Sequence, residues 1–305
     1  MKAVKKKNNN KIKERFGINS IYKGLIILLL VVYCASLLFV LFWLVYSSLK
    51  KVDEYILYPL KLPEVWCFEN YKEFFEKFSV VQMTYKGKIR YGLGAMFSNS
   101  ILWALLAPAV NVFWNTFTGY IIAKYRNKFT KFLYIFGVFV MVVPIVGSGA
   151  AARRLMYDIG MYDNLLMWVL RGPGVYFSGM HFMLMYSVFK EMPNSFSEAA
   201  EIDGASDLGV LFRIYAPLAF PSMMVLFILN FIGSWNDYGM FLYNLPSYPN
   251  IAYGMYMFQQ LASSLQISTP VILAGFVVTS VPVIIFYFCS QNLIMKNFSI
   301  GGIKG

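Results

Sequence analysis

Long runs of uncharged, mostly apolar residues alternate with short charged segments along this chain of 305 residues. A run of about 18 or more such residues is long enough to cross the hydrocarbon core of a bilayer as one helix. Five runs lie between Lys23 and Lys50, Arg90 and Lys124, Lys131 and Arg153, Arg171 and Lys190, and Arg213 and Asp237, and a sixth lies at Pro270–Leu293. The pattern predicts an all-α polytopic membrane protein with six transmembrane helices.

The same alternation divides the chain into segments. Residues 1–23 are predicted to be a basic cytoplasmic tail, 24–48 the first transmembrane helix and 49–94 an extracytoplasmic loop. Residues 95–293 are expected to form a core of five transmembrane helices with a polar loop at 194–217, and 294–305 a cytoplasmic C-terminal tail. Hydrophobic residues make up 58% of the chain and charged residues 14%, where ordinary globular domains carry about a quarter charged residues. No large soluble domain fits in what remains.

The net charge of +12 is distributed in the manner of a membrane protein. Eight of the 27 lysines and arginines lie in residues 1–23, and the short segment Lys124–Lys131 carries four more without any acidic residue. Such basic segments tend to stay on the cytoplasmic side, but the first outer loop is also basic, so charge alone supports this orientation only in part. The prediction that both termini are cytoplasmic depends on the family resemblance given below, which implies that the loop at 194–217 is cytoplasmic. The remaining basic residues are scattered through short loops and build no basic face on a fold, so no binding to nucleic acid is predicted.

One polar segment, Asn194–Pro221, stands between two apolar runs. Five acidic residues lie within it or just before it, and so many carboxylates belong in water at a membrane face. Ser195, followed three residues later by Glu198, has the spacing of a capping box at the start of a helix. Two alanines follow, and Gly204 permits a turn before a second amphipathic stretch that runs into Pro217. The segment predicts a helix–turn–helix with a small, flat Ala/Ala/Gly surface that suits a docking partner.

The spacing within this segment resembles the EAA loop of ABC-importer permeases. The motif EAA is followed after three residues by a glycine, after nine more by an isoleucine, and after one more by Ala-Pro. In that family the loop forms the cytoplasmic coupling helix, which lodges in a cleft of the ATP-hydrolysing subunit. The resemblance implies these ATPase-coupling residues: Glu198, Ala199, Ala200, Asp203, Gly204, Ile214 and Pro217. An ordinary surface helix is the alternative interpretation of residues 195–203 taken alone.

Two further patches are similar to the carbohydrate-importer branch of that family, namely WND at Trp235–Asp237 and the closing GGIKG at Gly301–Gly305. The resemblance implies the type I ABC-importer permease fold and import of a carbohydrate, an oligosaccharide, across a bacterial cytoplasmic membrane. It also implies as partners a second homologous permease, two cytoplasmic ATPase subunits that bind ATP and Mg, and an extracytoplasmic solute-binding protein. The tail residues Gly301, Gly302, Lys304 and Gly305 are expected to contact the ATPase interface, with a frayed end as the alternative.

Polar and aromatic residues near one end of the fifth run are candidates for a sugar pathway. Aromatic faces stack on the C–H surfaces of sugars and amides bond their hydroxyl groups. These expected path or gate residues are Asn230, Trp235, Asn236, Asp237 and Tyr238. Aromatic residues at a membrane interface also serve as plain anchors, so that alternative stays open for Trp235 and Tyr238.

The chain carries no sequence pattern for chemistry of its own. It has no Gly-x-x-x-x-Gly-Lys-Ser/Thr loop for ATP, its three cysteines have no metal or redox spacing, and its one histidine, His181, is expected to be a packed polar residue. We therefore predict a transporter subunit rather than an enzyme, without a cofactor. Two alternatives remain: an ABC permease for a solute other than a sugar, and a polytopic membrane enzyme or assembly factor.

Overall fold

The computed structural model describes residues 2–84, 87–125, 127–143, 148–171 and 179–300. The chain divides into two compact units. The first comprises Met1–Phe74 and Gln266–Val277, and the second comprises Phe75–Leu265 and Val278–Gly305. Two helices, α3 (Glu69–Lys77) and α14 (Thr269–Ile300), pass from one unit into the other.

The first unit is dominated by α1 (Lys2–Ser48), a single helix that includes the segment predicted as a basic tail. Its stretch Tyr22–Ser48 is 27 residues long and apolar enough to cross a membrane. Side chains from Tyr22 to Phe42 are mostly exposed in the chain, as expected for a helix that faces lipid.

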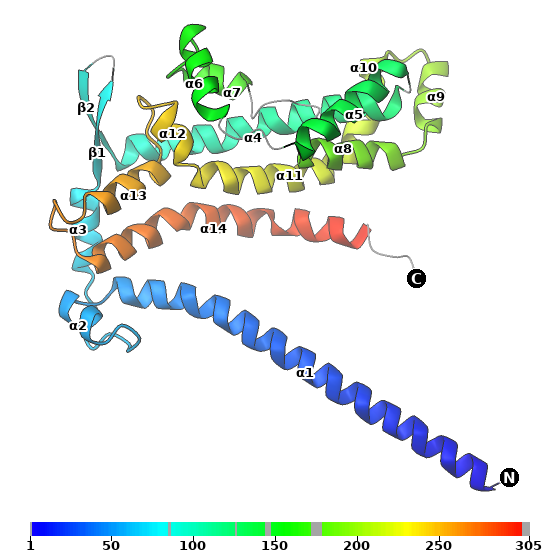
Figure 1. Cartoon of the computed structure of the whole chain (residues 1–305), viewed down its shortest axis with the longest axis horizontal. Helices are drawn as coiled ribbons and strands as arrows, with labels where there is room; N and C mark the ends of the chain where they lie inside the picture. The colour runs from blue at the N-terminus through cyan, green and yellow to red at the C-terminus, as the bar shows by residue number, and fades with distance from the viewer. Residues whose placement is uncertain (1, 85–86, 126, 144–147, 172–178, 301–305) are drawn as a thin grey trace. The chain divides into compact units, whose positions relative to one another are not determined.

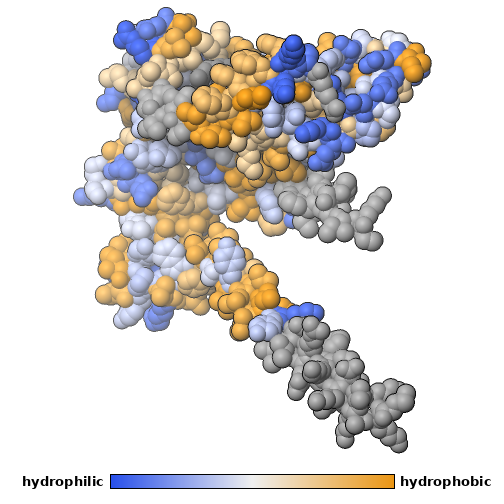
Figure 2. All heavy atoms as spheres, turned by 45° about the vertical axis from the view of Figure 1, so that its right-hand side comes forward, coloured by the Kyte–Doolittle hydropathy of each residue, from blue (hydrophilic) through white to orange (hydrophobic). Residues whose placement is uncertain are grey.

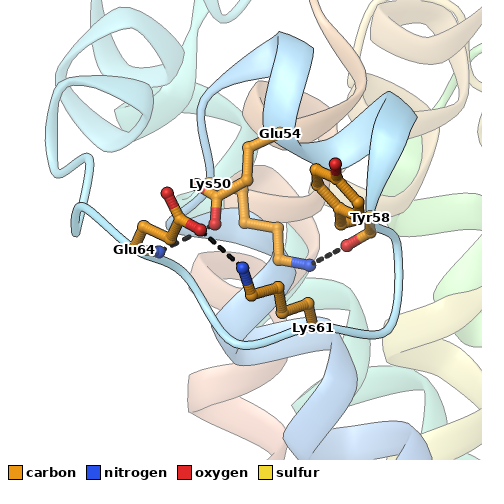
Figure 3. Close-up of polar contacts among 5 residues, drawn as sticks. All are labelled: Lys50, Glu54, Tyr58, Lys61 and Glu64. Atoms are coloured by element: carbon orange, nitrogen blue, oxygen red, sulfur yellow. Dashed lines mark hydrogen bonds and ion pairs between the residues drawn. The ribbon is translucent and has the colours of Figure 1, made fainter.

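The segment after α1 folds around a buried lysine (Figure 3). Lys50, which is 0% exposed, donates from Nζ to the backbone oxygens of Tyr58 at 2.8 Å and Pro59 at 3.1 Å. Burial lowers the pKa of this ammonium group, and the two carbonyls replace the water it has lost. The short helix α2 (Val52–Leu57) lies within this segment, and the Glu54 carboxylate accepts from the backbone N–H of Glu64 at 2.7 Å. The loop is thus held by local contacts to the end of α1.

The second unit contains most of the helices and a hairpin. The sequence did not predict the hairpin, which pairs β1 with β2 in antiparallel register, Val81 opposite Arg90. The elements are β1 (Ser79–Thr84), β2 (Gly87–Gly92), α4 (Leu93–Lys124), α5 (Lys128–Val142), α6 (Ser148–Asp158), α7 (Leu165–Arg171), α8 (Met180–Glu191), α9 (Ser195–Ile202), α10 (Asp207–Val210), the π-turn Leu211–Tyr215, α11 (Ala216–Asn236), α12 (Gly239–Tyr243) and α13 (Ile251–Gln260).

Helices α4, α8 and α11 run side by side and form the core of this unit (Figure 1). Gly119 allows α4 and α8 to approach closely, because a Cβ atom there would lie 3.0 Å from both Met185 Cβ and the Tyr186 backbone nitrogen. Small residues permit this kind of approach between membrane helices. Next to it, the buried rings of Tyr120, Phe189 and Tyr215 pack with centroids 5.4 to 6.4 Å apart.

Four helical segments in the described part of the chain are long and apolar enough to cross a membrane: Tyr22–Ser48, Leu93–Lys124, Asp207–Asn236 and Thr269–Asn292. Helices α5 and α8, where the third and fourth crossings were expected, have 15 and 12 residues and adjoin residues outside the described ranges. The count of six crossings therefore stays a prediction. On the face shown in Figure 2, hydrophobic side chains cover much of the surface and hydrophilic ones gather in separate patches.

The fifth predicted crossing begins earlier than the sequence indicated. The helical path is continuous from Asp207 to Asn236, and Pro217 does not start it but lies inside it. Proline has no N–H and clashes with the carbonyl four residues before it. The wider π-turn at Leu211–Tyr215 lies just before the proline, with the Ala216 N–H bonded to the Leu211 oxygen, and lets the helix continue.

Candidate coupling loop and path pocket

The polar loop between α8 and α11 is a helix–turn–helix, as predicted. Helix α9 ends in a Schellman motif, in which the Ala205 N–H donates to the Ala200 oxygen at 2.9 Å and the Gly204 N–H to the Glu201 oxygen at 3.0 Å. Gly204 has φ +78° and nothing within 4 Å of where a Cβ would stand, so the glycine is needed for its backbone conformation and not for space. This confirms the turn at Gly204.

The predicted capping box at Ser195 and Glu198 does not form. Asn194, not Ser195, occupies the N-cap position, and its side chain makes no capping bond to the helix. Instead, the Asn194 side-chain oxygen accepts from Lys124 Nζ at 3.0 Å. A capping side chain does occur at the second helix, where Ser206 Oγ accepts from the Gly209 N–H at 3.2 Å. A tertiary contact has replaced the local cap at α9.

The expected flat Ala/Ala/Gly surface is also wrong in part, because successive residues of a helix point about 100° apart. Ala200 is 8% exposed and packs in the core with Tyr120 and Tyr215, whereas Ala199 faces outward. The outward face also carries Ile202, which is 87% exposed. Ile202 was not among the residues predicted from the sequence, although its position two residues after Ala200 lies inside the predicted coupling segment.

Of the other predicted coupling residues, Glu198, Asp203 and Pro217 are exposed and Ile214 is half-buried. Ile214 lies in the π-turn and packs against the aromatic core of the unit. The exposed set on α9 and its turn therefore consists of side chains free to meet a partner, while Ala200 and Ile214 hold the loop to the rest of the unit.

The loop is fixed to its neighbours by polar contacts from other elements. Lys124, the last residue of α4, donates to the Met192 oxygen at 2.6 Å, and its Nζ lies 4.6 Å from the centroid of the Tyr215 ring. The Tyr215 hydroxyl donates to the Pro193 oxygen at 3.0 Å. Burial first, and then a hydrogen bond with the Asp207 carboxylate, raise the pKa of Tyr125. These contacts hold the loop to the end of α4 and to the π-turn before α11.

A pocket of about 530 Å³ lies in the same unit, among α4, α7, α8, α11 and α12; we call it the path pocket. Its walls combine aromatic rings with amides and a hydroxyl, and none of the described residues that line it is a lysine or arginine. The polar lining residues are Trp103, Asn111, Trp168, His181, Asn230, Ser234 and Asp237.

Two of the five predicted path residues line this pocket. Asn230 lies within 3.5 Å of His181 Nδ1, and the Asp237 carboxylate accepts from the Met240 N–H at 3.0 Å. Residues 230, 233, 234 and 237 follow the spacing of one helical face, and all four line the pocket.

The other three predicted path residues point elsewhere. Trp235 is 3% exposed and packs edge-on against Phe97 at 6.0 Å, so it belongs to the core. Asn236 is exposed and donates to the Ile232 oxygen at 2.9 Å. Tyr238 stacks on Tyr256, with centroids 4.8 Å apart. The spacing of helical faces explains the split, because Trp235 and Asn236 lie between the pocket-facing positions.

Trp103, Asn111 and Trp168 also line the pocket but were not among the predicted path residues, and His181 was expected only to be a packed polar residue. Trp103 and Asn111 lie two turns apart on α4, a spacing that places both on one face. The Trp103 indole N–H is buried without a hydrogen-bond partner in the described part of the protein. A buried donor of this kind is uncommon in proteins, and here it lies in the pocket wall.

A network of polar contacts ties the segments around Asp237 together. Asn250 donates to the Asp237 backbone oxygen at 3.0 Å, and Ser247 donates to the Asp163 carboxylate from its backbone N–H at 2.9 Å and its hydroxyl at 2.6 Å. Ser100 on α4 accepts from the Ile251 N–H at 2.8 Å. The loops near this end of the pocket are therefore held to α4 and to each other.

The predicted tail contacts at Gly301, Gly302, Lys304 and Gly305 lie outside the described residues. Within the described residues, no group of three or more His, Cys, Asp or Glu side chains is arranged to hold a metal ion.

Known proteins resemble the chain over most of its length. It is 27% identical over 287 residues to the inner membrane ABC transporter permease protein YcjP of Escherichia coli (strain K12), covering 90% of this chain and 95% of the relative. It is 25% identical over 292 residues to the arabinooligosaccharides transport system permease protein AraQ of Bacillus subtilis (strain 168), covering 94% of this chain and 97% of the relative. It is 26% identical over 292 residues to the diacetylchitobiose uptake system permease protein NgcG of Streptomyces coelicolor (strain ATCC BAA-471 / A3(2) / M145), covering 90% of this chain and 86% of the relative.

The fold matches a chain in the crystal structure of a bacterial ABC transporter involved in the import of the acidic polysaccharide alginate. The TM-score is 0.69 at 22% identity, with 89% of this chain and 96% of the other covered. Residues 115–299 match the family model described as "Binding-protein-dependent transport system inner membrane component". The alternative of a membrane enzyme is therefore dropped. The chain belongs to the family of binding-protein-dependent transport system inner membrane components, the membrane-spanning permease subunits of ABC transporters.

Proposed function

We propose that this chain is one of two permease subunits of an ATP-driven importer for a carbohydrate, an oligosaccharide. The observation that carries this is the similarity, over 90% or more of the chain, to permeases named for arabino-oligosaccharides and diacetylchitobiose. The other half of the translocation path would come from a second homologous permease. An extracytoplasmic solute-binding protein would deliver the sugar, and both termini of the chain would lie on the cytoplasmic side of a bacterial cell membrane.

The chemistry of the path pocket supports a carbohydrate. Trp103 and Trp168 offer apolar ring faces for the C–H surfaces of a sugar, and Asn111 and Asn230 offer amides for its hydroxyl groups. The unpartnered Trp103 N–H would find its acceptor in a hydroxyl oxygen. Because Asp237 is the only charged side chain among the described residues that line it, the pocket favours an uncharged sugar over a uronate.

The coupling loop supplies the link to ATP, which two cytoplasmic ATPase subunits would bind together with Mg. The exposed face of α9, with Ala199 and Ile202, would dock in a cleft of one ATPase subunit. ATP binding would draw the coupling helices of both permeases together and turn the pathway outward, and hydrolysis would reset it.

A single helical path connects the two sites. It runs for 30 residues from Asp207, at the end of the coupling loop, to Asn236, beside the path pocket. At 1.5 Å per residue this is a lever of roughly 45 Å. A displacement of the loop is therefore transmitted directly to the wall that carries Asn230 and Asp237.

The test is uptake by the complete transporter in proteoliposomes, with a panel of labelled neutral oligosaccharides, uronate oligosaccharides, peptides and phosphate. Binding of the same panel to the cognate solute-binding protein identifies what is delivered. We expect ATP-dependent uptake of a neutral oligosaccharide. Uptake confined to a peptide or phosphate would establish the alternative, an ABC permease for another solute.

A further inference from the structure

A second pocket, of about 770 Å³, opens where α4 ends, α5 begins and α8 passes; we call it the lysine pocket. Three lysines line it, Lys128 and Lys131 from α5 and Lys190 from α8, and none of the described residues that line it is acidic. All three side chains are exposed, and no carboxylate within the described ranges forms an ion pair with any of them. The pocket therefore concentrates positive charge that the described chain leaves unneutralised.

The remaining walls of the pocket are also suited to an anion with a polar head. The rings of Tyr134 and Tyr186 are half-buried and lie 4.6 Å apart between centroids, and Lys190 Nζ lies 5.5 Å from the Tyr186 centroid. Lysine binds phosphate as a mobile point charge, and the tyrosine hydroxyls add hydrogen-bond donors.

The pocket lies at the end of the helices that carries the coupling loop. Lys124, the last residue of α4, reaches from this end to the Met192 oxygen, just before the loop. Helix α4 is long and apolar enough to cross a membrane, so we place the boundary between lipid and water at its end. Basic pockets between membrane helices at such a boundary are suited to anionic lipid headgroups.

Beside the pocket, α5 presents a row of exposed apolar rings. Phe129, Phe132, Phe136 and Phe139 recur every three or four residues and are 42 to 66% exposed. This spacing puts them on one face of the helix. A ligand with a phosphate head and long apolar tails would meet cations at one end and this phenylalanine face along its length, whereas a free anion would use only the lysines.

We propose that the lysine pocket binds the headgroup of an anionic phospholipid, whose acyl chains lie along the phenylalanine face of α5. The site is separate from the path pocket, since the two share none of the described residues that line them. A lipid held there joins α5 to α8, four residues before the coupling loop begins at Asn194. The proposal rests on the membrane family of the chain and is independent of which solute is carried.

The test uses the complete purified transporter and native mass spectrometry, with phosphatidylglycerol or phosphatidylcholine added to the detergent. We expect the native protein to retain phosphatidylglycerol, and the triple variant Lys128→Gln/Lys131→Gln/Lys190→Gln to lose this retention roughly tenfold or more. The matched control is Lys51→Gln/Lys72→Gln/Lys88→Gln, which removes the same charge from exposed lysines elsewhere and should retain the lipid. A second variant with arginine at the three pocket positions should retain it too.

Equal retention by the two glutamine triples would overturn the proposal. So would displacement of the lipid by millimolar inorganic phosphate with phosphate bound in its place, which would make the pocket a free-anion site. If the pocket triple releases the ATPase subunits while its lipid retention is unchanged, the lysines belong to a protein interface and the proposal fails. The assembly yield of each variant is measured first. If the glutamine triple does not assemble, lipid retention by the arginine variant is the test, and loss of the lipid from that variant would overturn the proposal.

Discussion

The coupling loop and the path pocket stand at opposite ends of one helical path, and they are built differently. The loop comes from one continuous stretch, residues 194–217, shaped by backbone bonds between neighbours such as those closing the turn at Gly204. The pocket is assembled from five helices, with Trp103 and Met240 more than a hundred residues apart in sequence. A site of the first kind depends on backbone conformation, and one of the second kind on side chains meeting across a fold.

The largest expected effect comes from the backbone of the loop. Gly204→Leu forces a branched residue to φ +78° and places its bulk on the face that would dock. Strain of about 1–2 kcal/mol and crowding of about 1–3 kcal/mol predict a loss of roughly a hundredfold in coupled ATP hydrolysis and transport. The rates are measured in proteoliposomes with the partner subunits.

Gly204→Asn is the control for this change, because asparagine tolerates the left-handed region and nothing in the chain crowds the position. It should keep most of the activity. If Gly204→Leu transports at the native rate, the loop has no coupling role.

A smaller loss is expected from the exposed apolar contact on α9. Ile202→Ser removes a side chain that is 87% exposed in the chain and that would be buried on docking. The lost burial, about 2 kcal/mol, predicts roughly 30-fold weaker association of the ATPase subunits. Affinity is measured by titrating the ATPase into permease complexes in lipid discs. Ile56→Ser, an exposed isoleucine far away in sequence on α2, is the matched control and should leave the affinity unchanged.

The path pocket should respond in substrate affinity rather than in coupling. Asn230→Ala removes an amide from the pocket wall, and about 1.4 kcal/mol of hydrogen bonding predicts a tenfold rise in the half-saturating sugar concentration. The control is Asn236→Ala, which changes an amide of the same helix that points away from the pocket. Sugar capture by the solute-binding protein serves as the internal reference for both. If Asn236→Ala raised the half-saturating sugar concentration as much as Asn230→Ala, the face of α11 that lines the pocket would not be the one that contacts the sugar.

These differences explain what could be predicted from sequence. The turn at Gly204 and the long helices were predictable, because local backbone rules and apolar length determine them. The cap at α9 was not, because the Asn194 side chain is drawn to Lys124, 70 residues away in sequence. The hairpin β1–β2 was hidden in a mixed polar segment whose alternation is weak.

The path pocket was half predictable. Asn230 and Asp237 share one helical face with Gly233 and Ser234, and this spacing is visible in the sequence. The choice of Trp235 rested on residue type, and the structure places that ring in the core. The contributions of Trp103 and Trp168 depend on how α4 and α7 meet α11, which no local pattern reveals.

The smallest expected effect concerns helix caps. The structure has a side-chain cap at α10, from Ser206, whereas the sequence predicted one at α9, from Ser195. Ser206→Ala removes the oxygen that accepts from the Gly209 N–H, at a cost of about 1 kcal/mol to the start of α10. Hydrogen–deuterium exchange of the amides at 207–211, measured by mass spectrometry on the assembled complex, should become roughly fivefold faster. Ser195→Ala should change exchange at α9 very little, because Ser195 is not the N-cap residue there. Faster exchange at α9 in Ser195→Ala, with α10 unchanged in Ser206→Ala, would reinstate the capping box. The loop would then be stabilised by its own sequence rather than by its contact with Lys124.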